Sequence, residues 1–194
     1  MPAEGWKAEQ TVAAASARCF QGTVWRVHWR EVAPTDWTLS LRTSGRYHRG
    51  LDLFPPDQAF PALYTSLAPE IAIWEMVRRS AARNLAYLEN NVLSELEVDL
   101  SRILDISDPN PVGLTAADLT GPDHQPCQEL AEAALARGYQ GLLVPSAALP
   151  GLNLVILPRN LPEPSPIRLL RSTDLPIEIL AHQHSEDRPG QEQR

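Results

Sequence analysis

Alternation of apolar and polar residues predicts strands in two parts of this chain. In residues 24–29 bulky apolar side chains alternate with polar ones, and in residues 94–106 leucine and valine alternate with acidic residues. Successive side chains of a strand point to opposite faces, so this pattern is typical of a half-buried strand. Shorter apolar runs predict further strands at residues 37–41, 62–64, 142–144, 152–157, 167–170 and 176–180.

A wider spacing of apolar residues predicts helices. Pro69 suits a first helical turn, Glu70 suits the positive end of the helix dipole, and apolar residues in 71–85 form a broad stripe. A second helix is predicted at residues 129–137, ended by Gly138 as its C-cap, and a short one within residues 1–21.

The predicted strands outnumber the helices and follow no regular order, which indicates an α+β fold. The 18 prolines punctuate loops, and residues 45–61 and 107–125 are read as loop and turn. We expect an N-terminal extension over residues 1–22, a single domain over 23–180 and a polar, disordered tail over 181–194.

Charge and cysteine content restrict the classes of function. The chain has 17 Lys and Arg against 24 Asp and Glu, a net charge of −7, which argues against direct binding of nucleic acid. A local basic loop containing Arg42, Arg46, His48 and Arg49 still suits a small anionic molecule. The 2 cysteines make no disulfide framework, and no transmembrane run or secretory signal is recognised, so we expect a cytoplasmic protein that does not bind membranes.

Two candidate site residues lie close together in the sequence. Tyr64 at a strand end and Glu75 on the following helix are placed to reach one cleft across a strand–turn–helix unit. Glu75 stands among apolar residues, so its carboxylate either pairs with a cation or faces a pocket. The alternative for Glu75 is an ion pair with Arg78 or Arg79, and the alternative for Tyr64 is an ordinary core aromatic.

Two further candidates have equally plain alternatives. Arg46 follows Gly45 in a loop, where a guanidinium fork suits a phosphate or carboxylate, unless it is only a solvated charge. Ser146 ends a short strand, where it is either a site residue or a simple turn residue.

His124 and Cys127 lack a second ligand pair with zinc spacing, so no metal site is predicted. No phosphate-binding or nucleophile-elbow motif is present.

Taken together, these residues resemble the RES domain family, the toxin half of a class of bacterial toxin–antitoxin pairs. RES domains carry an Arg in a Gly-Arg-Trp-Asn-like element, a Tyr at the end of the next strand, a Glu in the following helix and a Ser in a Gly-strand-Pro-Ser element. In this chain Arg46, Tyr64, Glu75 and Ser146 stand in those places. The resemblance covers about residues 23–157.

The chain departs from the family pattern around the arginine. The Trp-Asn pair is Tyr47-His48 here, and the segment between Arg46 and Tyr64 carries an extra proline-containing piece. Arg49 therefore remains an alternative to Arg46.

The resemblance implies a fold like that of ADP-ribosyltransferases, with a split β-sheet core and flanking short helices, and an enzyme that cleaves the nicotinamide–ribose bond of NAD+. NAD+ would be the substrate, and no resident cofactor is implied. By this analogy Glu75 stabilises the developing cation and holds a ribose hydroxyl, and Tyr64 orients the nicotinamide. Arg46 would bind the pyrophosphate, and Ser146 would add a hydrogen bond to phosphate or ribose. Arg26 is a weaker candidate for substrate binding, because on an alternating strand it fits a structural role equally well.

The acceptor stays open at this point. Water would make the protein a glycohydrolase, phosphate a phosphorylase, and a protein side chain an ADP-ribosyltransferase. The resemblance also implies an Xre-like antitoxin with a helix-turn-helix part, which would make the DNA contacts within a multimeric complex. The non-enzymatic alternative is a binding protein, or a RES relative that has lost activity through its altered Arg46 loop.

Overall fold

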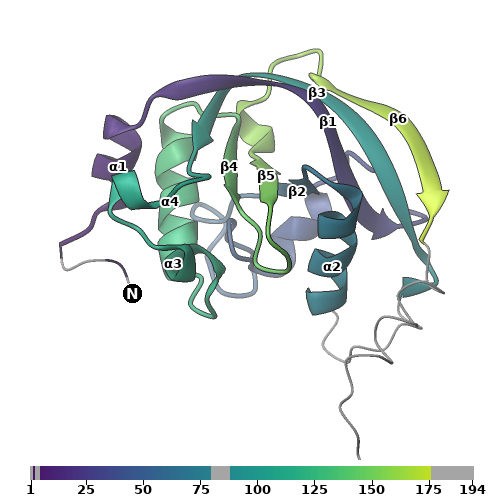
Figure 1. Cartoon of the computed structure of the whole chain (residues 1–194), viewed down its shortest axis with the longest axis horizontal. Helices are drawn as coiled ribbons and strands as arrows, with labels where there is room; N and C mark the ends of the chain where they lie inside the picture. Colours follow the sequence, from purple (N-terminus) through teal and green to yellow (C-terminus); the bar gives the residue numbers. More distant parts are fainter. Residues whose placement is uncertain (1, 3–4, 80–87, 176–194) are drawn as a thin grey trace, which may run out of the picture.

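The computed structural model describes residues 2, 5–79 and 88–175 (Figure 1). Its elements in chain order are α1 (Ala8–Ala14), β1 (Ala17–Trp29), the 3-10 helix η1 (Thr38–Leu41), β2 (Leu63–Ser66), α2 (Pro69–Arg79), β3 (Asn91–Asp105), the 3-10 helix η3 (Asn110–Val112), α3 (Ala116–Thr120), α4 (Gln125–Ala136), β4 (Gly141–Pro145), β5 (Leu152–Ile156), the 3-10 helix η4 (Pro158–Asn160) and β6 (Ile167–Asp174). The mixture of elements confirms the α+β class.

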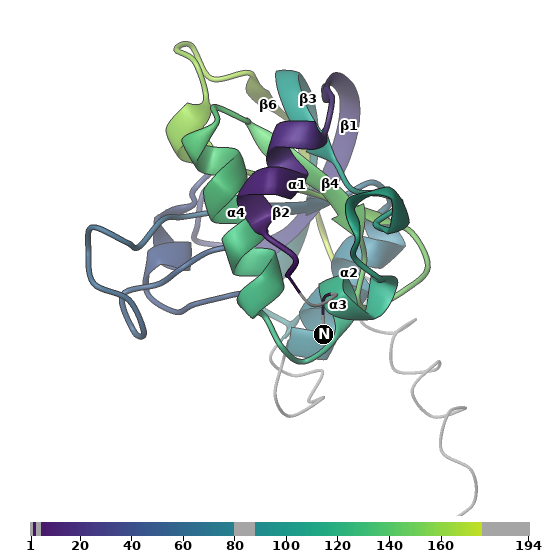
Figure 2. The ribbon, with the colours of Figure 1, turned by 90° about the vertical axis from the view of Figure 1, so that its left-hand side faces the viewer.

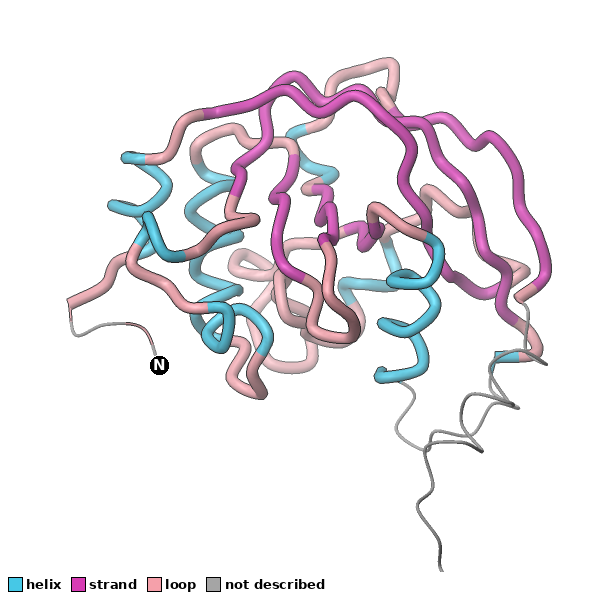
Figure 3. Tube along the Cα trace, viewed as in Figure 1, coloured by secondary structure: helices cyan, strands magenta, loops and turns pink. Residues whose placement is uncertain are grey.

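The strands form one sheet that closes on itself. Their order is β1-β2-β5-β4-β3-β6, and β1 also pairs with β3, so the first five strands of that order make a ring with β6 outside it. The pairing of β3 with β4 is parallel, and the other pairings are antiparallel. Figure 3 shows the strands as one curved layer with the helices around it. Closure leaves few unpaired strand edges within the ring.

The sheet is not split into two separate sheets as expected, but its strands fall into two groups. One group is β1, β3 and β6, and the other is β2, β5 and β4. The groups are joined on one side by the Trp25–Ser66 pair between β1 and β2, and on the other by the parallel β3–β4 pairing. The result is a small barrel-like sheet instead of two separate sheets.

Buried side chains form three apolar clusters around this sheet. The ring encloses one that includes Val24, Leu63, Leu96 and Leu154. A second lies between the sheet and α1 and α4, and a third lies under α2. Helices α1, α3 and α4 accordingly gather at one end of the sheet and α2 at the other (Figures 1 and 2). Helix α1, within the expected extension, packs against α4 and buries Val12.

The predictions from periodicity were correct for the long elements. From Val92 to Ser101 of β3 the burial alternates from residue to residue as expected, and α2 begins at Pro69. The second helix is confirmed but starts earlier, at Gln125, and Gly138 adopts the expected positive φ of 77°. The strand predicted at 176–180, the tail over 181–194 and the far end of the predicted 71–85 stripe lie outside the described residues.

The strand predicted at residues 37–41 was wrong, because that segment is the 3-10 helix η1. Asp36 Oδ1 accepts hydrogen bonds from both the backbone N–H and the hydroxyl of Thr38, each at 2.7 Å. Ser40 donates its hydroxyl to the carbonyl of Trp37 at 2.6 Å. Such local bonds favour a turn over a strand.

Helix α3 was not predicted within the turn-rich stretch 107–125. Its start is a capping box, in which the side chains of Thr115 and Asp118 each accept from the other's backbone N–H. The cap stabilises a helix too short to show an apolar stripe.

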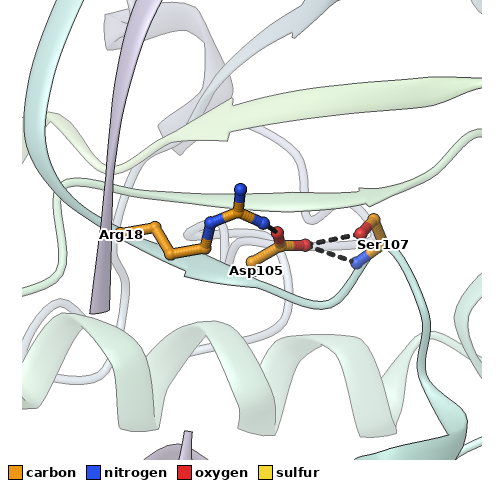
Figure 4. Close-up of polar contacts among 3 residues, drawn as sticks. All are labelled: Arg18, Asp105 and Ser107. Atoms are coloured by element: carbon orange, nitrogen blue, oxygen red, sulfur yellow. Dashed lines mark hydrogen bonds and ion pairs between the residues drawn. The ribbon is translucent and has the colours of Figure 1, made fainter. Parts of the chain in front are cut away.

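The carboxylate of Asp105 fixes the end of β3 by hydrogen bonds and an ion pair (Figure 4). Asp105 accepts from the hydroxyl and backbone N–H of Ser107 and forms an ion pair with Arg18 of β1. Burial alone would raise the pKa of Asp105, but the bonds from Ser107 and then the charge of Arg18 bring it below its ordinary value. The chain thus leaves β3 in a fixed direction. In the described part of the chain, no helix combines the length and apolar character needed to cross a membrane.

The ring interior should dominate the free energy of unfolding. Leu96 is fully buried in the cluster inside the ring, so Leu96→Ala leaves a cavity and should cost about 2–5 kcal/mol. Leu51, which is 53% exposed, is the control, and Leu51→Ala should change the free energy by less than about 0.5 kcal/mol. Chemical denaturation of both variants measures the difference. Equal losses would contradict this account of the core.

His28 should make stability depend on pH. Its ring is buried, Nε2 lies 2.7 Å from Ser94 Oγ, and burial lowers the pKa of His28 below its ordinary 6.5. The unfolded chain therefore takes up a proton that the folded chain does not, and the free energy of unfolding should fall as pH drops below about 6.5. Denaturation at pH 7.5 and 5.5 should show a smaller fall for His28→Gln than for the wild type. Equal falls would refute this assignment.

Candidate active site

A pocket of about 210 Å³ opens where β1, β2, α2 and β5 meet the loop before β2. Its polar lining residues come from distant parts of the sequence: Arg26, Ser44, Arg46, Tyr64, Glu75, Arg78, His124 and Asn153. Aromatic and apolar walls are supplied by Trp25, Val27, Tyr47, Ala72, Met76 and Val155. Concave sites of mixed apolar walls and a few convergent polar groups are typical of small-molecule binding.

Glu75 is held by one of its two carboxylate oxygens. Oε1 accepts hydrogen bonds from Ser146 Oγ at 2.6 Å, from the backbone N–H of Ala147 at 3.0 Å and from Asn153 Nδ2 at 2.8 Å. Oε2 accepts none from the described residues, although Glu75 lines the pocket. Three donors on one oxygen fix the orientation of the carboxylate and leave its second oxygen available to a ligand.

The turn between β4 and β5 brings these donors to α2. Gly151 has φ +147°, and a Cβ at this position would lie 2.2 Å from Ile71 Cδ1. The positive φ favours glycine here, and the absence of a side chain leaves room for Ile71 of α2. The backbone N–H of Ser146 donates to the Gly151 carbonyl at 2.9 Å and closes the turn.

Asn153 links Glu75 to the neighbouring strand. The register of β2 and β5 places Ser66 opposite Asn153, and the Ser66 hydroxyl donates to Asn153 Oδ1 at 2.7 Å. This bond orients the Asn153 amide so that its Nδ2 faces Glu75. The network Ser66–Asn153–Glu75–Ser146 therefore spans two strands, a turn and a helix.

The alternative in which Glu75 pairs with Arg78 is not formed. Arg78 instead donates to the carbonyl of Thr120 at 3.4 Å and lines the pocket. The side chain of Arg79 lies outside the described part of the molecule. Among the described residues, Glu75 is bound by uncharged donors only.

Tyr64 is partly buried in β2, and its ring lines the same pocket as Glu75. Its hydroxyl accepts from the backbone N–H of Tyr47 at 2.9 Å and lies 2.9 Å from Nδ1 of His48. The predicted meeting of Tyr64 and Glu75 in one cleft is thus present in the structure.

Arg46 also lines the pocket and is anchored by one nitrogen. Its Nη1 donates to the carbonyls of Leu119 at 3.2 Å and Gly121 at 2.7 Å, at the end of α3. The Arg46 side chain also makes a hydrogen-bonding contact with the thiol of Cys127. A guanidinium that lines the pocket suits a phosphate or carboxylate of a ligand.

The two remaining arginine candidates differ in position. Arg26 of β1 lines the pocket and donates through Nη2 to the carbonyl of Asp36 at 3.0 Å. Arg49 is directed away from the pocket, pairs with Glu132 of α4 and stacks over the ring of Phe54 at 4.9 Å. The geometry favours Arg46 over Arg49 as the residue that meets a ligand.

Ser146 is bonded directly to Glu75. Its hydroxyl donates to Glu75 and accepts from the backbone N–H of Ala148 at 3.1 Å, and it is not part of the pocket lining. The structure therefore shows Ser146 bonded to Glu75, and its bond to a ligand stays a prediction.

His124 adds a neutral group to the pocket. Burial lowers the pKa of His124 below its ordinary value, and the charges of Arg46 and then Arg78 lower it further. Near neutral pH the imidazole is therefore uncharged beside two guanidinium groups. The described residues contain no group of three or more His, Cys, Asp and Glu placed to hold a metal ion.

Asn153 and Ser66 were not singled out as site residues by the sequence, and His48 was named only as part of the basic loop. Asn153 is the one polar residue in the apolar strand β5, and an amide in such a strand needs partners, which is a usable signal. Ser66 carried no comparable signal, since its role depends on strand register, and the contact of His48 with Tyr64 depends on the path of the loop.

Comparison with known proteins agrees with this fold. A family model described as RES domain matches residues 23–178. No curated protein matches the chain. Seven chains of solved structures do. One belongs to the crystal structure of the M. tuberculosis MbcT-MbcA toxin-antitoxin complex, with a TM-score of 0.76 and 26% identity, over 92% of this chain and 97% of that chain.

The Glu75–Asn153 bond should be essential to the network. Asn153→Asp replaces a donor by a second carboxylate beside Glu75 and should lower the free energy of unfolding by about 1–3 kcal/mol at pH 7. The double variant Glu75→Gln with Asn153→Asp restores a donor–acceptor pair and should recover most of the loss. Denaturant titration measures both, and a fully stable Asn153→Asp variant would contradict the bond.

Proposed function

The chain belongs to the RES domain family, and we propose on that basis that it is the toxin of a toxin–antitoxin pair and cleaves the nicotinamide–ribose bond of NAD+. The observation that carries the proposal is the state of Glu75. One carboxylate oxygen is bound by three donors, the other accepts no hydrogen bond from the described residues, and Glu75 lines a pocket that arginines also line.

The pocket chemistry suits a substrate with charges of both signs. NAD+ combines an anionic pyrophosphate with a cationic nicotinamide. Arg46 and Arg26 would bind the pyrophosphate, and Arg78 adds a third positive charge. A single carboxylate among these cations matches the single positive centre of the substrate.

Glu75 would act on the sugar. Nicotinamide leaves as a neutral molecule from a cationic ring, so its departure needs no proton donor. What lowers the barrier is a fixed negative charge beside the developing oxocarbenium ion, as in glycosidases. Oε2 of Glu75 would supply that charge and hold a ribose hydroxyl, while Ser146 and Asn153 keep the carboxylate from rotating away.

Tyr64 would orient the nicotinamide through its ring. Its hydroxyl contacts Tyr47 and His48 in the loop before β2, and Tyr64 lines the pocket, so we expect its aromatic face to meet the nicotinamide. A flat ring held in this way restricts the positions that nicotinamide can adopt.

Water or inorganic phosphate would accept the ADP-ribosyl group, which makes the enzyme a glycohydrolase or a phosphorylase. The fold would be of the ADP-ribosyltransferase type. The second candidate function, transfer of ADP-ribose to a target molecule, uses the same residues. An inactive relative that only binds NAD+ is the non-enzymatic alternative.

The partner would be an antitoxin. A solved structure similar to this chain is part of a toxin-antitoxin complex, and a cytoplasmic NAD+-cleaving enzyme needs restraint in its own cell. We infer an Xre-like protein with a helix-turn-helix part, which would cover the pocket and make the DNA contacts of a multimeric complex. The net charge of −7 fits a toxin that does not itself bind DNA.

Glu75→Gln tests the reaction most simply. The amide oxygen still accepts the three hydrogen bonds, so the fold should persist, but the charge is lost, and nicotinamide release should fall by about 100-fold or more. Glu70→Gln, an exposed change on the same helix, is the matched control and should leave release unchanged. Release is measured on antitoxin-free protein with and without phosphate, which identifies the acceptor.

The outcomes separate the alternatives. Release by Glu75→Gln at the wild-type rate would exclude the assigned role of Glu75. A folded wild-type protein that binds NAD+ but releases no nicotinamide, even with a cell extract as acceptor source, would be the inactive relative. Release only with that extract would identify a transferase.

A further inference from the structure

His48 is a buried histidine that the reaction above does not use. Its side chain is 1% exposed, although it stands in the loop before β2. The ring packs edge-on against Tyr64 with centroids 5.6 Å apart and planes at 68°. A buried histidine in contact with a residue of the pocket needs an explanation from its hydrogen bonds.

The two hydrogen bonds of His48 define its tautomer. Nε2 lies 2.8 Å from the carbonyl oxygen of Thr43, which can only accept, so Nε2 carries the proton. Nδ1 of the neutral ring is then an acceptor, and the Tyr64 hydroxyl at 2.9 Å donates to it. The backbone N–H of Tyr47 completes the arrangement by donating to that hydroxyl.

Gly45 allows this close packing. A Cβ at Gly45 would lie 2.3 Å from His48 Cε1, 2.7 Å from its Nδ1 and 3.0 Å from the Tyr64 hydroxyl. The backbone N–H of Gly45 also donates to the His48 carbonyl at 3.3 Å. The loop that carries Arg46 is therefore folded tightly around the His48–Tyr64 bond.

We propose that His48, as the neutral tautomer protonated on Nε2, is a positioning residue that fixes the ring of Tyr64 in the pocket. Because the hydroxyl proton of Tyr64 is directed at His48, Tyr64 acts through its aromatic face and not as a proton donor. The catalytic part of this inference rests on the proposed function.

Kinetics of four variants test the proposal. His48→Leu removes the acceptor and should lower kcat/KM for nicotinamide release about tenfold. His48→Asn, whose Oδ1 stands as many bonds from the backbone as Nδ1 and can accept the same proton, should stay within about threefold of the wild type. Tyr64→Phe should resemble His48→Leu. The double variant His48→Leu with Tyr64→Phe should be no slower than the slower single variant, because both changes remove one interaction.

Several results would overturn it. Wild-type kcat/KM in His48→Leu would show that His48 positions nothing. A double variant slowed by the product of the two single factors would show that the residues act independently. Failure of His48→Asn to retain activity while it remains folded would show that acceptance of the Tyr64 proton is not what His48 provides.

An NMR measurement separates this proposal from the reaction itself. The 15N spectrum of the wild-type protein, with the His48 signals identified by their loss in His48→Asn, should show a protonated Nε2 and an unprotonated Nδ1 at neutral pH. The opposite tautomer or a doubly protonated ring would refute the proposal whether or not His48→Leu folds. If the wild type releases no nicotinamide, the proposed reaction fails, yet this spectrum still decides the state of His48.

Discussion

The antiparallel pairing of β1 with β3 is the constraint on which the rest of the structure depends. It closes the sheet into a ring and sets the position of Arg26, which lies opposite Ser94. Strand β4 runs parallel to the end of β3, so the same pairing determines where the β4–β5 turn emerges. That turn carries Ser146 to the carboxylate of Glu75. A local site thus depends on contacts between strands far apart in the sequence.

The pocket is lined mainly by positive charges, whereas the whole chain carries a net negative charge. The protein is acidic overall, with a net charge of −7, but Arg26, Arg46 and Arg78 surround the pocket and Glu75 is the carboxylate among them. His124 is kept neutral by burial and by its arginine neighbours. Such an arrangement favours a ligand that is anionic along most of its length and cationic at one point. This distribution is the physical reason for preferring NAD+ over a simple anion.

The spacing of apolar residues was sufficient to predict the long strand and helices, because each of them buries one face in the core. It predicted β3 and α2, and with α2 it placed Glu75 correctly relative to Tyr64. It failed at residues 37–41, where bonds from Asp36 close a 3-10 turn. The partners of Glu75 were not predictable for another reason. The pairing of Ser66 with Asn153 and the approach of the β4–β5 turn to α2 are set by register and by Gly151.

The central claim is that Oε2 of Glu75, which accepts no hydrogen bond from the described residues, meets the nicotinamide ribose. A crystal structure with a non-hydrolysable NAD+ analogue tests this directly. The account predicts Glu75 Oε2 within about 2.6–3.2 Å of a hydroxyl of that ribose, with the pyrophosphate on Arg46. An analogue bound with its nicotinamide ribose away from Glu75, or with its pyrophosphate on Arg49, would contradict it.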